Sequence, residues 1–274
     1  EFGCEKTRNS YYRSDVHIVT WNVNSLKARL PRVQEWISES QPDVLLIQET
    51  KLAQDKFPHA EMTELGYESA HFGQGQWNGV AIISRVGLDN VVNNFSSGIE
   101  PDGEARIITA NCGGVQVSSV YVPNGRSLDH DHYQYKLSWL SRLRAHLDAS
   151  CKPTDDVVVG GDFNIAPEDR DVYDMKAFAD ATHVSAAERD ALARVCEFGL
   201  TDTFRQFNDE DKVFSWWDYR GGAFHKGHGM RIDLLLATSS VAARAKGSVI
   251  DRNARKERDS GKPSDHVPVI LEVG

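Results

Sequence analysis

The chain has 274 residues, of which 40% are hydrophobic and 26% charged, and its formal net charge is −9 at pH 7. This composition is ordinary for a globular protein and excludes a disordered or fibrous chain. No apolar run approaches the length of about 18 residues that a transmembrane helix needs. The negative charge argues weakly against a nucleic-acid partner, although a local basic surface can coexist with an acidic total.

A chain of this length can form one large domain, and we expect a single domain over residues 16–274. Residues 1–15 contain no apolar segment or cleavage pattern of a secretory signal and are expected to be a disordered extension. The simplest expectation is a cytoplasmic monomer without membrane contact. The cysteines show no CxxC pair or metal-like spacing and are expected to be reduced thiols: Cys4, Cys112, Cys151 and Cys196.

The first predicted elements are a strand and an amphipathic helix. Val16–Trp21 alternates and is rich in β-branched residues, and apolar residues at helical spacing follow from Leu26 to Ile37. Val44–Ile47 is a short strand of the buried type. Three further strands, with a hairpin turn at Gly113-Gly114, are predicted at Gly79–Ser84, Ala105–Asn111 and Val115–Val122.

The second half of the chain combines two helices with more strands. An apolar stripe from Tyr133 to Leu147 predicts a long helix. Ser185–Phe198 predicts another, with a capping box of Ser185 and Glu188 and a stop at Gly199. Many strands and few helices favour an α+β fold, with packed sheets inside and helices outside. The strands of this half are predicted at Val157–Val159, Val213–Trp216, Ile232–Ala237 and Val267–Val273.

Polar residues stand at the ends of several predicted strands. In mixed or antiparallel sheets, the C-terminal ends of some strands lie beside the N-terminal ends of others. We therefore expect these polar residues to lie together at one edge of the sheets. Asn22, Glu49, Asp162 and Asn164 follow the ends of predicted strands. Asp233, Asp265 and His266 stand at or just before the starts of predicted strands.

Each of these residues also has an ordinary explanation. Asp and Asn are common in turns at strand ends, so each one taken singly fits a turn or cap better than a site. His266 alone fits a structural histidine. Glu49 fits a turn least well, because Glu is not a favoured turn residue. The joint pattern is what indicates a functional site.

Acids, amides and one histidine, without a thiolate or an activated serine, indicate phosphoryl chemistry. A few carboxylates completed by water suit Mg²⁺, whereas Zn²⁺ prefers clusters of Cys and His that this chain lacks. The metal and a protonated histidine stabilise charge on phosphate oxygens, while an acid orients or deprotonates water. Hydrolysis of a phosphodiester or phosphomonoester is the leading reaction class. No GxxxxGK[ST] or dinucleotide motif is present, which argues against a nucleotide-driven motor or kinase.

Eight segments occur in a specific order: "TWNVNSLKARL", "PDVLLIQETKL", "NGVAIISR", "YVPNG", "GGDFNIAP", "FSWWDYRGG", "GMRIDLLLA" and "KPSDHVPV". In this order they closely resemble the exonuclease III family of apurinic/apyrimidinic (AP) endonucleases, from about residue 16 to the C-terminus. Several phosphoesterases similar to deoxyribonuclease I share an acid after the second strand and a late Asp-His, but "WWDYR" and "YVPNG" are more specific. The resemblance implies a four-layer α/β/β/α sandwich of two mixed sheets, with helices outside and the site at one edge.

The resemblance also implies the metal and the roles of the polar residues. The metal would be Mg²⁺, with Mn²⁺ as a substitute. A carboxylate bonded to one ring nitrogen raises the basicity of imidazole, which gives a pairing of His266 with Asp233 a physical reason. The resemblance implies that Glu49 binds the metal, supported by Asn24 and Asp265. Asp162 would activate the attacking water, which Asn22 and Asn164 would place. His266, oriented by Asp233, would contact the phosphate together with Tyr121.

The implied substrate is double-stranded DNA with abasic sites or blocked 3′ ends. Cleavage would occur 5′ to the abasic site, accompanied by 3′→5′ exonuclease and 3′-end trimming. A sugar without a base would enter an apolar pocket, since its extrusion costs less than that of a paired nucleotide. Trp216 and Trp217 could instead fill the hydrophobic core and take no part in binding the sugar. The implied pocket and DNA contacts are Trp216, Met230, Ile232, Asn124, Arg126 and Arg106, with Lys51 as a further candidate for phosphate contact.

Two alternatives remain open at this point. The same fold serves other phosphoesterases, including inositol-phosphate phosphatases, sphingomyelinases and secreted nucleases. A noncatalytic DNA-binding relative would be expected to lack Glu49, Asp162 or His266, and all three are present.

Overall fold

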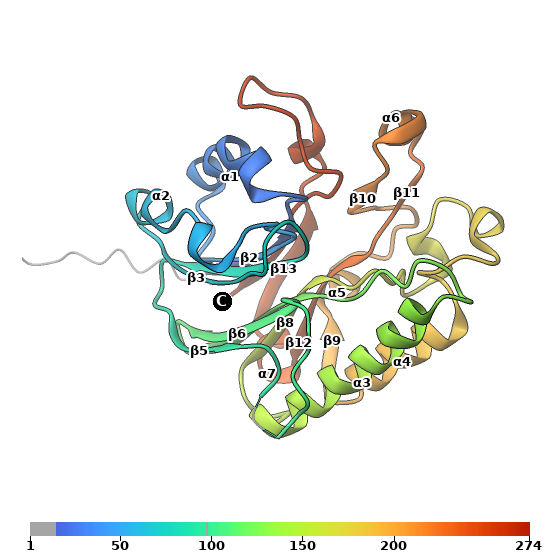
Figure 1. The fold of residues 1–274 in the computed structure, drawn as a ribbon, viewed down its shortest axis with the longest axis horizontal. Coiled ribbons are helices and arrows are strands. Elements are labelled where there is room, and N and C mark those ends of the chain that lie inside the picture. Colours follow the sequence, from blue (N-terminus) through green and yellow to red (C-terminus); the bar gives the residue numbers. More distant parts are fainter. Residues whose placement is uncertain (1–14, 97) are drawn as a thin grey trace, which may run out of the picture.

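A computed structural model describes residues 15–96 and 98–274 of the chain (Figure 1). The predicted extension over residues 1–15 lies outside this description except for Asp15, and so does Cys4. The other cysteines are free thiols, as predicted. No helix in the described ranges is both long enough and apolar enough to cross a membrane.

The first six-stranded sheet is mixed. Its central strands β1 (Val16–Asn22) and β2 (Val44–Gln48) run parallel, while the other neighbours pair antiparallel. Aliphatic and β-branched residues bury β2 along its whole length, as expected for a strand covered on both faces. The spatial order is β13 (Ala245–Ile250), β14 (Val269–Val273), β1, β2, β4 (Val80–Ser84) and β3 (Glu68–Phe72).

The second six-stranded sheet repeats this plan. Strands β7 (Val115–Tyr121) and β8 (Val157–Asp162) run parallel at its centre, and its other neighbours pair antiparallel. The predicted turn at Gly113-Gly114 joins β6 to β7. The spatial order is β5 (Asp89–Asn93), β6 (Ile107–Cys112), β7, β8, β12 (Asp233–Thr238) and β9 (Leu200–Asp202).

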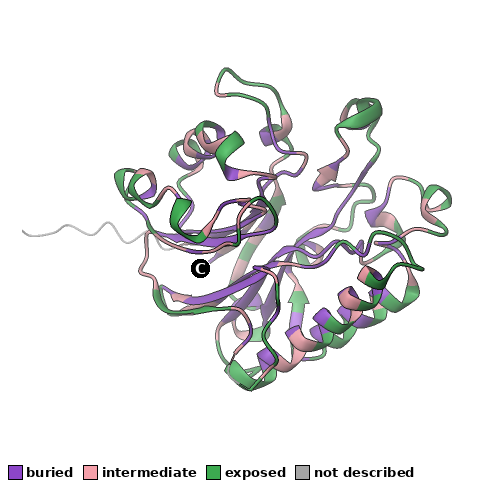
Figure 2. Ribbon diagram, in the orientation of Figure 1, coloured by how far each residue is buried: buried purple, intermediate pink, exposed green. Residues whose placement is uncertain are grey.

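Helices cover the outer faces, which gives the predicted four-layer sandwich (Figure 1). Helix α1 (Leu26–Ser40) packs on the first sheet, and α3 (Asp131–Ser150) and α4 (Ala186–Cys196) pack on the second. Apolar side chains of both sheets meet in a core between them. Figure 2 shows the buried strands inside and exposed helical surface outside. The shorter helices are α2 (His59–Glu64), α5 (Thr203–Phe207), α6 (Ala223–Lys226) and α7 (Ser239–Ala242).

The polar strand ends meet at one edge of the sandwich, as predicted. Asn22 ends β1, and Glu49 directly follows the neighbouring strand β2. Tyr121 and Asp233, on the two strands beside β8, are both paired with Asp162. A two-stranded ribbon of β10 (Trp216–Trp217) and β11 (Gly229–Met230), with α6 at its tip, rises beside this edge (Figure 1).

Some predicted elements need correction. The predicted strand Val213–Trp216 is wrong in its bounds, because only Trp216 and Trp217 form β10 and the preceding residues form a loop. The last strand begins at Val269 instead of Val267, since Pro268 has no N–H for the ladder. The patterns also missed the strands β3, β5, β9, β11 and β13 and the short helices α2, α5, α6 and α7.

Two adjacent glycines let β8 lie at the centre of the sandwich. A Cβ on Gly161 would lie 1.9 Å from the carbonyl oxygen of Val120 on β7. A Cβ on Gly160 would lie 2.6 Å from the side chain of Leu46 in the opposite sheet. Larger residues at these positions would therefore push strands or sheets apart.

We predict that Gly161→Ala lowers the free energy of unfolding by about 1–3 kcal/mol, because a backbone carbonyl cannot move aside without disturbing the ladder. Urea denaturation measures the loss. Gly247→Ala on β13 is the control, because a Cβ there meets nothing within 4 Å, and it should change stability by less than about 0.5 kcal/mol. Equal losses in the two variants would contradict the steric explanation.

Candidate active site

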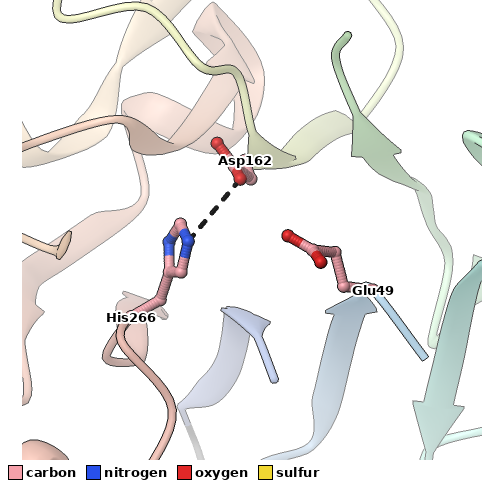
Figure 3. A group of neighbouring side chains, drawn as sticks. All are labelled: Glu49, Asp162 and His266. Carbon is pink, nitrogen blue, oxygen red and sulfur yellow. Dashed lines mark ion pairs between the residues drawn. The ribbon is translucent and has the colours of Figure 1, made fainter. Parts of the chain in front are cut away.

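Glu49, Asp162 and His266 point toward one another at the edge of the sandwich (Figure 3). One potential ligand atom of each lies within 4.8 Å of the others. Glu49 and His266 belong to the first sheet, where they flank β2 and β14, while Asp162 ends β8 in the second. The site therefore forms only where the two sheets meet.

The side-chain amide of Asn22 joins the carboxylates of the two sheets. Its Nδ2 donates to Glu49 Oε1 and to Asp162 Oδ2, both at 2.9 Å. Its Oδ1 accepts the backbone N–H of Asn24, also at 2.9 Å. Asn22 is fully buried, and both of its amide hydrogens are used. This residue holds two mutually repelling carboxylates side by side.

Asp162 is a buried acid that titrates near neutral pH. Its exposed fraction is 2%, and its Oδ1 accepts the backbone N–H of Asn164 at 2.9 Å. Burial raises the pKa of Asp162 to about 7, His266 opposes this rise, and Asp233 and Glu49 reinforce it. A carboxylate with this pKa is suited to take a proton from water and to release it again.

His266 forms a buried triad with Asp233 and Ser215. Its Nδ1 lies 2.9 Å from Asp233 Oδ2, and the Ser215 hydroxyl donates to the same oxygen at 2.6 Å. Burial opposes protonation, but Asp233 and then Asp162 outweigh it and raise the pKa of His266 to about 10. At neutral pH the imidazolium therefore carries an Nε2–H, which lies 3.8 Å from Asp162 Oδ2.

Tyr121 and Arg106 form a stacked pair beside these residues. The Arg106 guanidinium carbon lies 4.8 Å from the centroid of the Tyr121 ring, and Arg106 Nε pairs with Glu104 at 2.6 Å. Arg106 is only 5% exposed, so the structure gives it internal partners, and its predicted contact with a DNA phosphate stays a prediction. Burial, then Glu49 and Asp162, raises the pKa of Tyr121, which keeps the phenol as a hydrogen-bond donor.

Lys51 lies among the predicted metal ligands. Its Nζ is 2.8 Å from Glu49 Oε2 and 2.6 Å from Asn24 Oδ1. Asn24 Nδ2 donates to Asp265 Oδ1 at 3.0 Å, and Asp265 Oδ2 accepts from Trp216 Nε1 at 3.1 Å. One chain of contacts thus links the acid at Glu49 to the indole of Trp216.

The donor set at this edge fits a hard cation. A protonated His266 has no lone pair to offer, so the carboxylates of Glu49 and Asp162 are the groups of the cluster that could hold a metal ion. Each carboxylate oxygen accepts at two positions, and the bonds from Asn22 occupy only one position on each residue. These residues could hold a metal ion, and their oxygen atoms suit Mg²⁺ or Mn²⁺ better than Zn²⁺.

His183 is a pocket residue that sequence reasoning missed. Its Nε2 lies 3.2 Å from Asn164 Oδ1 and 3.1 Å from Asn124 Nδ2. Burial and then the charge of Lys136 lower the pKa of His183 to about 4, so the ring is neutral. It lies in the loop before α4, at no strand end, and only the tertiary fold brings it to the two amides.

Trp216, Met230 and Ile232 lie together as an apolar wall. The ribbon pairs Trp216 with Met230, and all three residues belong to one small apolar cluster. Between Met230 and Ile232, the fully buried Arg231 donates twice to Asp171, at 2.7 and 2.9 Å. Because alternate residues of an extended chain face opposite sides, this ion pair fixes which side the two apolar residues face.

A cavity of about 320 Å³ connects these groups. Met230, Asn24 and Arg126 do not line it. Arg126 is exposed, and Trp217 fills the core of the first sheet. Asp218 and Arg220 join the lining from the "WWDYR" segment. The lining residues are Glu49, Tyr121, Asn124, Asp162, Asn164, His183, Trp216, Asp218, Arg220, Ile232, Asp265 and His266.

Comparison with known proteins identifies the family. A model of the endonuclease/exonuclease/phosphatase family matches residues 19–266. The chain belongs to this family. Exodeoxyribonuclease III of Haemophilus influenzae is 32% identical over 269 residues, which cover 93% of this chain and 98% of the relative.

Two solved structures match the fold of this family member closely. An AP endonuclease from Archaeoglobus fulgidus has a TM-score of 0.89 and 36% identity, with 93% of this chain and 98% of that chain covered. The 3′ phosphatase NExo from Neisseria, bound to a product DNA hairpin, has a TM-score of 0.89 and 38% identity, with 94% and 99% covered. These matches confirm the predicted fold and family and make the chain a phosphodiesterase nuclease of the exonuclease III and AP endonuclease type.

We predict that Asp233→Asn lowers the pKa of His266, because Asp233 contributes most to raising it. NMR titration of the His266 ring measures this pKa, and nuclease activity should fall about 10- to 100-fold, as is typical when a partner that orients a site residue is lost. Asp218→Asn is the control, since that acid lines the same cavity without contacting His266. An unchanged His266 titration in Asp233→Asn would contradict the assignment.

Proposed function

We propose that the protein is a Mg²⁺-dependent DNA repair nuclease that cleaves the backbone 5′ to abasic sites in double-stranded DNA. It would also trim blocked 3′ ends and degrade DNA in the 3′→5′ direction. We further propose that it acts as a monomer on DNA inside the cell. The observation that carries the proposal is that one cavity brings together the buried acid Asp162, the protonated His266 and the apolar side chains of Trp216 and Ile232.

The proposed mechanism begins with the attacking water. Asp162 accepts a proton from it, and Asn164, whose side chain lines the same cavity, helps to place it. The deprotonated water attacks the phosphorus, the P–O3′ bond breaks, and the leaving 3′ oxygen takes up a proton from solvent water. The Nε2–H of His266 and the hydroxyl of Tyr121 donate to the phosphate oxygens as negative charge develops on them. Mg²⁺ bound through Glu49 would supply further stabilisation of that charge.

The apolar wall supports selectivity for a missing base. A deoxyribose without its base is smaller than a nucleotide, and it leaves the stack at lower cost. Trp216 offers an indole that a hydrogen bond to Asp265 holds in place, and Ile232 completes the lining beside it. Both are adjacent in the cavity to the groups that would hydrolyse the phosphate.

The similarity to NExo supports the 3′-end activity, because that relative is described as a 3′ phosphatase. The same water-activating acid and phosphate donors would serve a terminal phosphate. A noncatalytic binding role is disfavoured, since Glu49, Asp162 and His266 are all present and clustered.

The first test uses an end-labelled duplex that contains one tetrahydrofuran abasic analogue. The wild-type protein should incise it 5′ to the analogue with Mg²⁺ and not with chelator. Asp162→Asn should lower the rate about 10²- to 10⁴-fold, the usual contribution of a general base. Asp55→Asn, at an exposed surface acid outside the cavity, should cleave like wild type.

No incision by folded protein would remove the abasic-site proposal. Recessed ends and 3′-phosphate ends would then identify the remaining activity. Incision that persists in chelator would instead contradict the metal requirement.

The apolar wall has its own prediction, made with two substitutions at Trp216. Trp216→Ala should lower kcat/KM for the abasic duplex about 10- to 150-fold, because loss of a large buried apolar surface costs about 1.5–3 kcal/mol. Trp216→Phe keeps an aromatic face without the bond to Asp265 and should stay within about threefold of wild type. Steady-state incision assays compare them, and equal activity of Trp216→Ala and wild type would contradict a role for the indole.

A further inference from the structure

A buried ion pair lies beneath the cavity. Lys136 of α3 and Glu188 of α4 have no exposed side-chain surface, and Lys136 Nζ lies 2.5 Å from Glu188 Oε1. Burial favours the neutral form of each group, but each partner favours the charge of the other. A pair of this kind stabilises a fold only when its remaining donors and acceptors are also satisfied.

Most of the remaining bonds of this pair go to residues that line the cavity. Lys136 Nζ donates to the carbonyl oxygens of Asn164, at 2.6 Å, and Asn124, at 3.3 Å. With Glu188, these acceptors use all three ammonium hydrogens. Glu188 Oε1 also accepts the backbone N–H of His183 at 2.9 Å, and its Oε2 accepts the cap bonds of Ser185.

Asn164 connects the ion pair to the proposed general base. Its carbonyl is held by Lys136, while its backbone N–H donates to Asp162 Oδ1 at 2.9 Å. Its φ is 50°, in the left-handed region that non-glycine residues seldom occupy. Such a conformation persists only when surrounding contacts impose it, and the bond from Lys136 is one of those contacts.

We propose that Lys136, held by Glu188, is a positioning residue for the hydrolytic reaction. It fixes the backbone of Asn124 and Asn164, and through the Asn164 N–H it fixes the orientation of the Asp162 carboxylate. The proposal rests on the proposed function, in which Asp162 activates water. Helices α3 and α4, on the outside of the second sheet, thereby set the geometry of groups at its edge.

A purely structural role would have a different consequence. An ion pair that only stabilises the fold can be replaced by neutral residues with little effect on the reaction of folded protein. Removing Lys136 alone would leave a buried, unpaired carboxylate at Glu188. A loss of activity could then come from a loss of stability. The informative protein is therefore the double variant Lys136→Met with Glu188→Gln, because Gln can still form the capping box with Ser185.

In the folded double variant, kcat for the abasic duplex should fall at least tenfold with KM within threefold of wild type. The reason is that Trp216 and Ile232, which would bind the lesion, make no contact with the pair. Hydrogen–deuterium exchange of the peptide spanning residues 162–166 should be at least tenfold faster than in wild type, because the Asn164 N–H loses its fixed position.

The matched control is Arg85→Met with Asp43→Asn. This ion pair, 2.8 Å between Arg85 Nε and Asp43 Oδ1, joins the residue before β2 to the residue after β4, at the end of β2 opposite Glu49. The control should keep both kcat and the exchange rate of residues 162–166. Wild-type kcat and exchange in the folded Lys136 and Glu188 double variant would overturn the proposal. If wild-type protein does not incise the abasic duplex, the proposed function fails, and the exchange measurement still decides whether Lys136 holds Asn164.

Discussion

The site depends on the two hydrogen bonds that Asn22 donates from one amide nitrogen, to Glu49 of the first sheet and Asp162 of the second. Two carboxylates at this distance repel each other, and burial strengthens the repulsion. A neutral donor with two hydrogens relieves it without adding charge, which neither Asp nor Ser could do in the same place. The arrangement leaves lone pairs on both acids for a metal ion or for water.

The charges around Asn22 are arranged so that neighbouring acids have different tasks. Asp233 forms an ion pair with His266, and Glu49 forms one with Lys51. Asp265 accepts hydrogen bonds from Asn24 and Trp216. Asp162 accepts hydrogen bonds from the neutral donors of Asn22 and Asn164, and its ion pair with His266 is longer, at 3.8 Å. Its pKa of about 7 suits proton exchange with water at neutral pH. The different roles proposed for these similar acids thus follow from the different partners that each of them has.

The sequence predicted what is local and missed what depends on tertiary contact. The alternation of apolar residues and the residue types of turns show where a strand ends in the sequence. Polar residues at those ends, such as Asn22, Glu49, Asp162 and His266, could therefore be predicted as site residues. The edge strand β5 is exposed along its length and therefore carries no burial pattern to detect. His183 and the pair of Lys136 and Glu188 stand on loops and helix faces where an isolated polar residue has many ordinary explanations. The His183 ring meets Asn164 and Asn124 across 19 and 59 residues of chain, and Lys136 and Glu188 stand 52 residues apart.

Each sheet alone carries only part of the hydrolytic machinery, because Glu49 and His266 come with the first and Asp162 with the second. Their juxtaposition requires the close approach of the sheets that Gly160 permits at the interface. A chain with only the first sheet formed would lack Asp162, and a chain with only the second would lack Glu49 and His266. Assembly of the candidate site is therefore coupled to completion of folding, and a partly folded molecule would lack part of it.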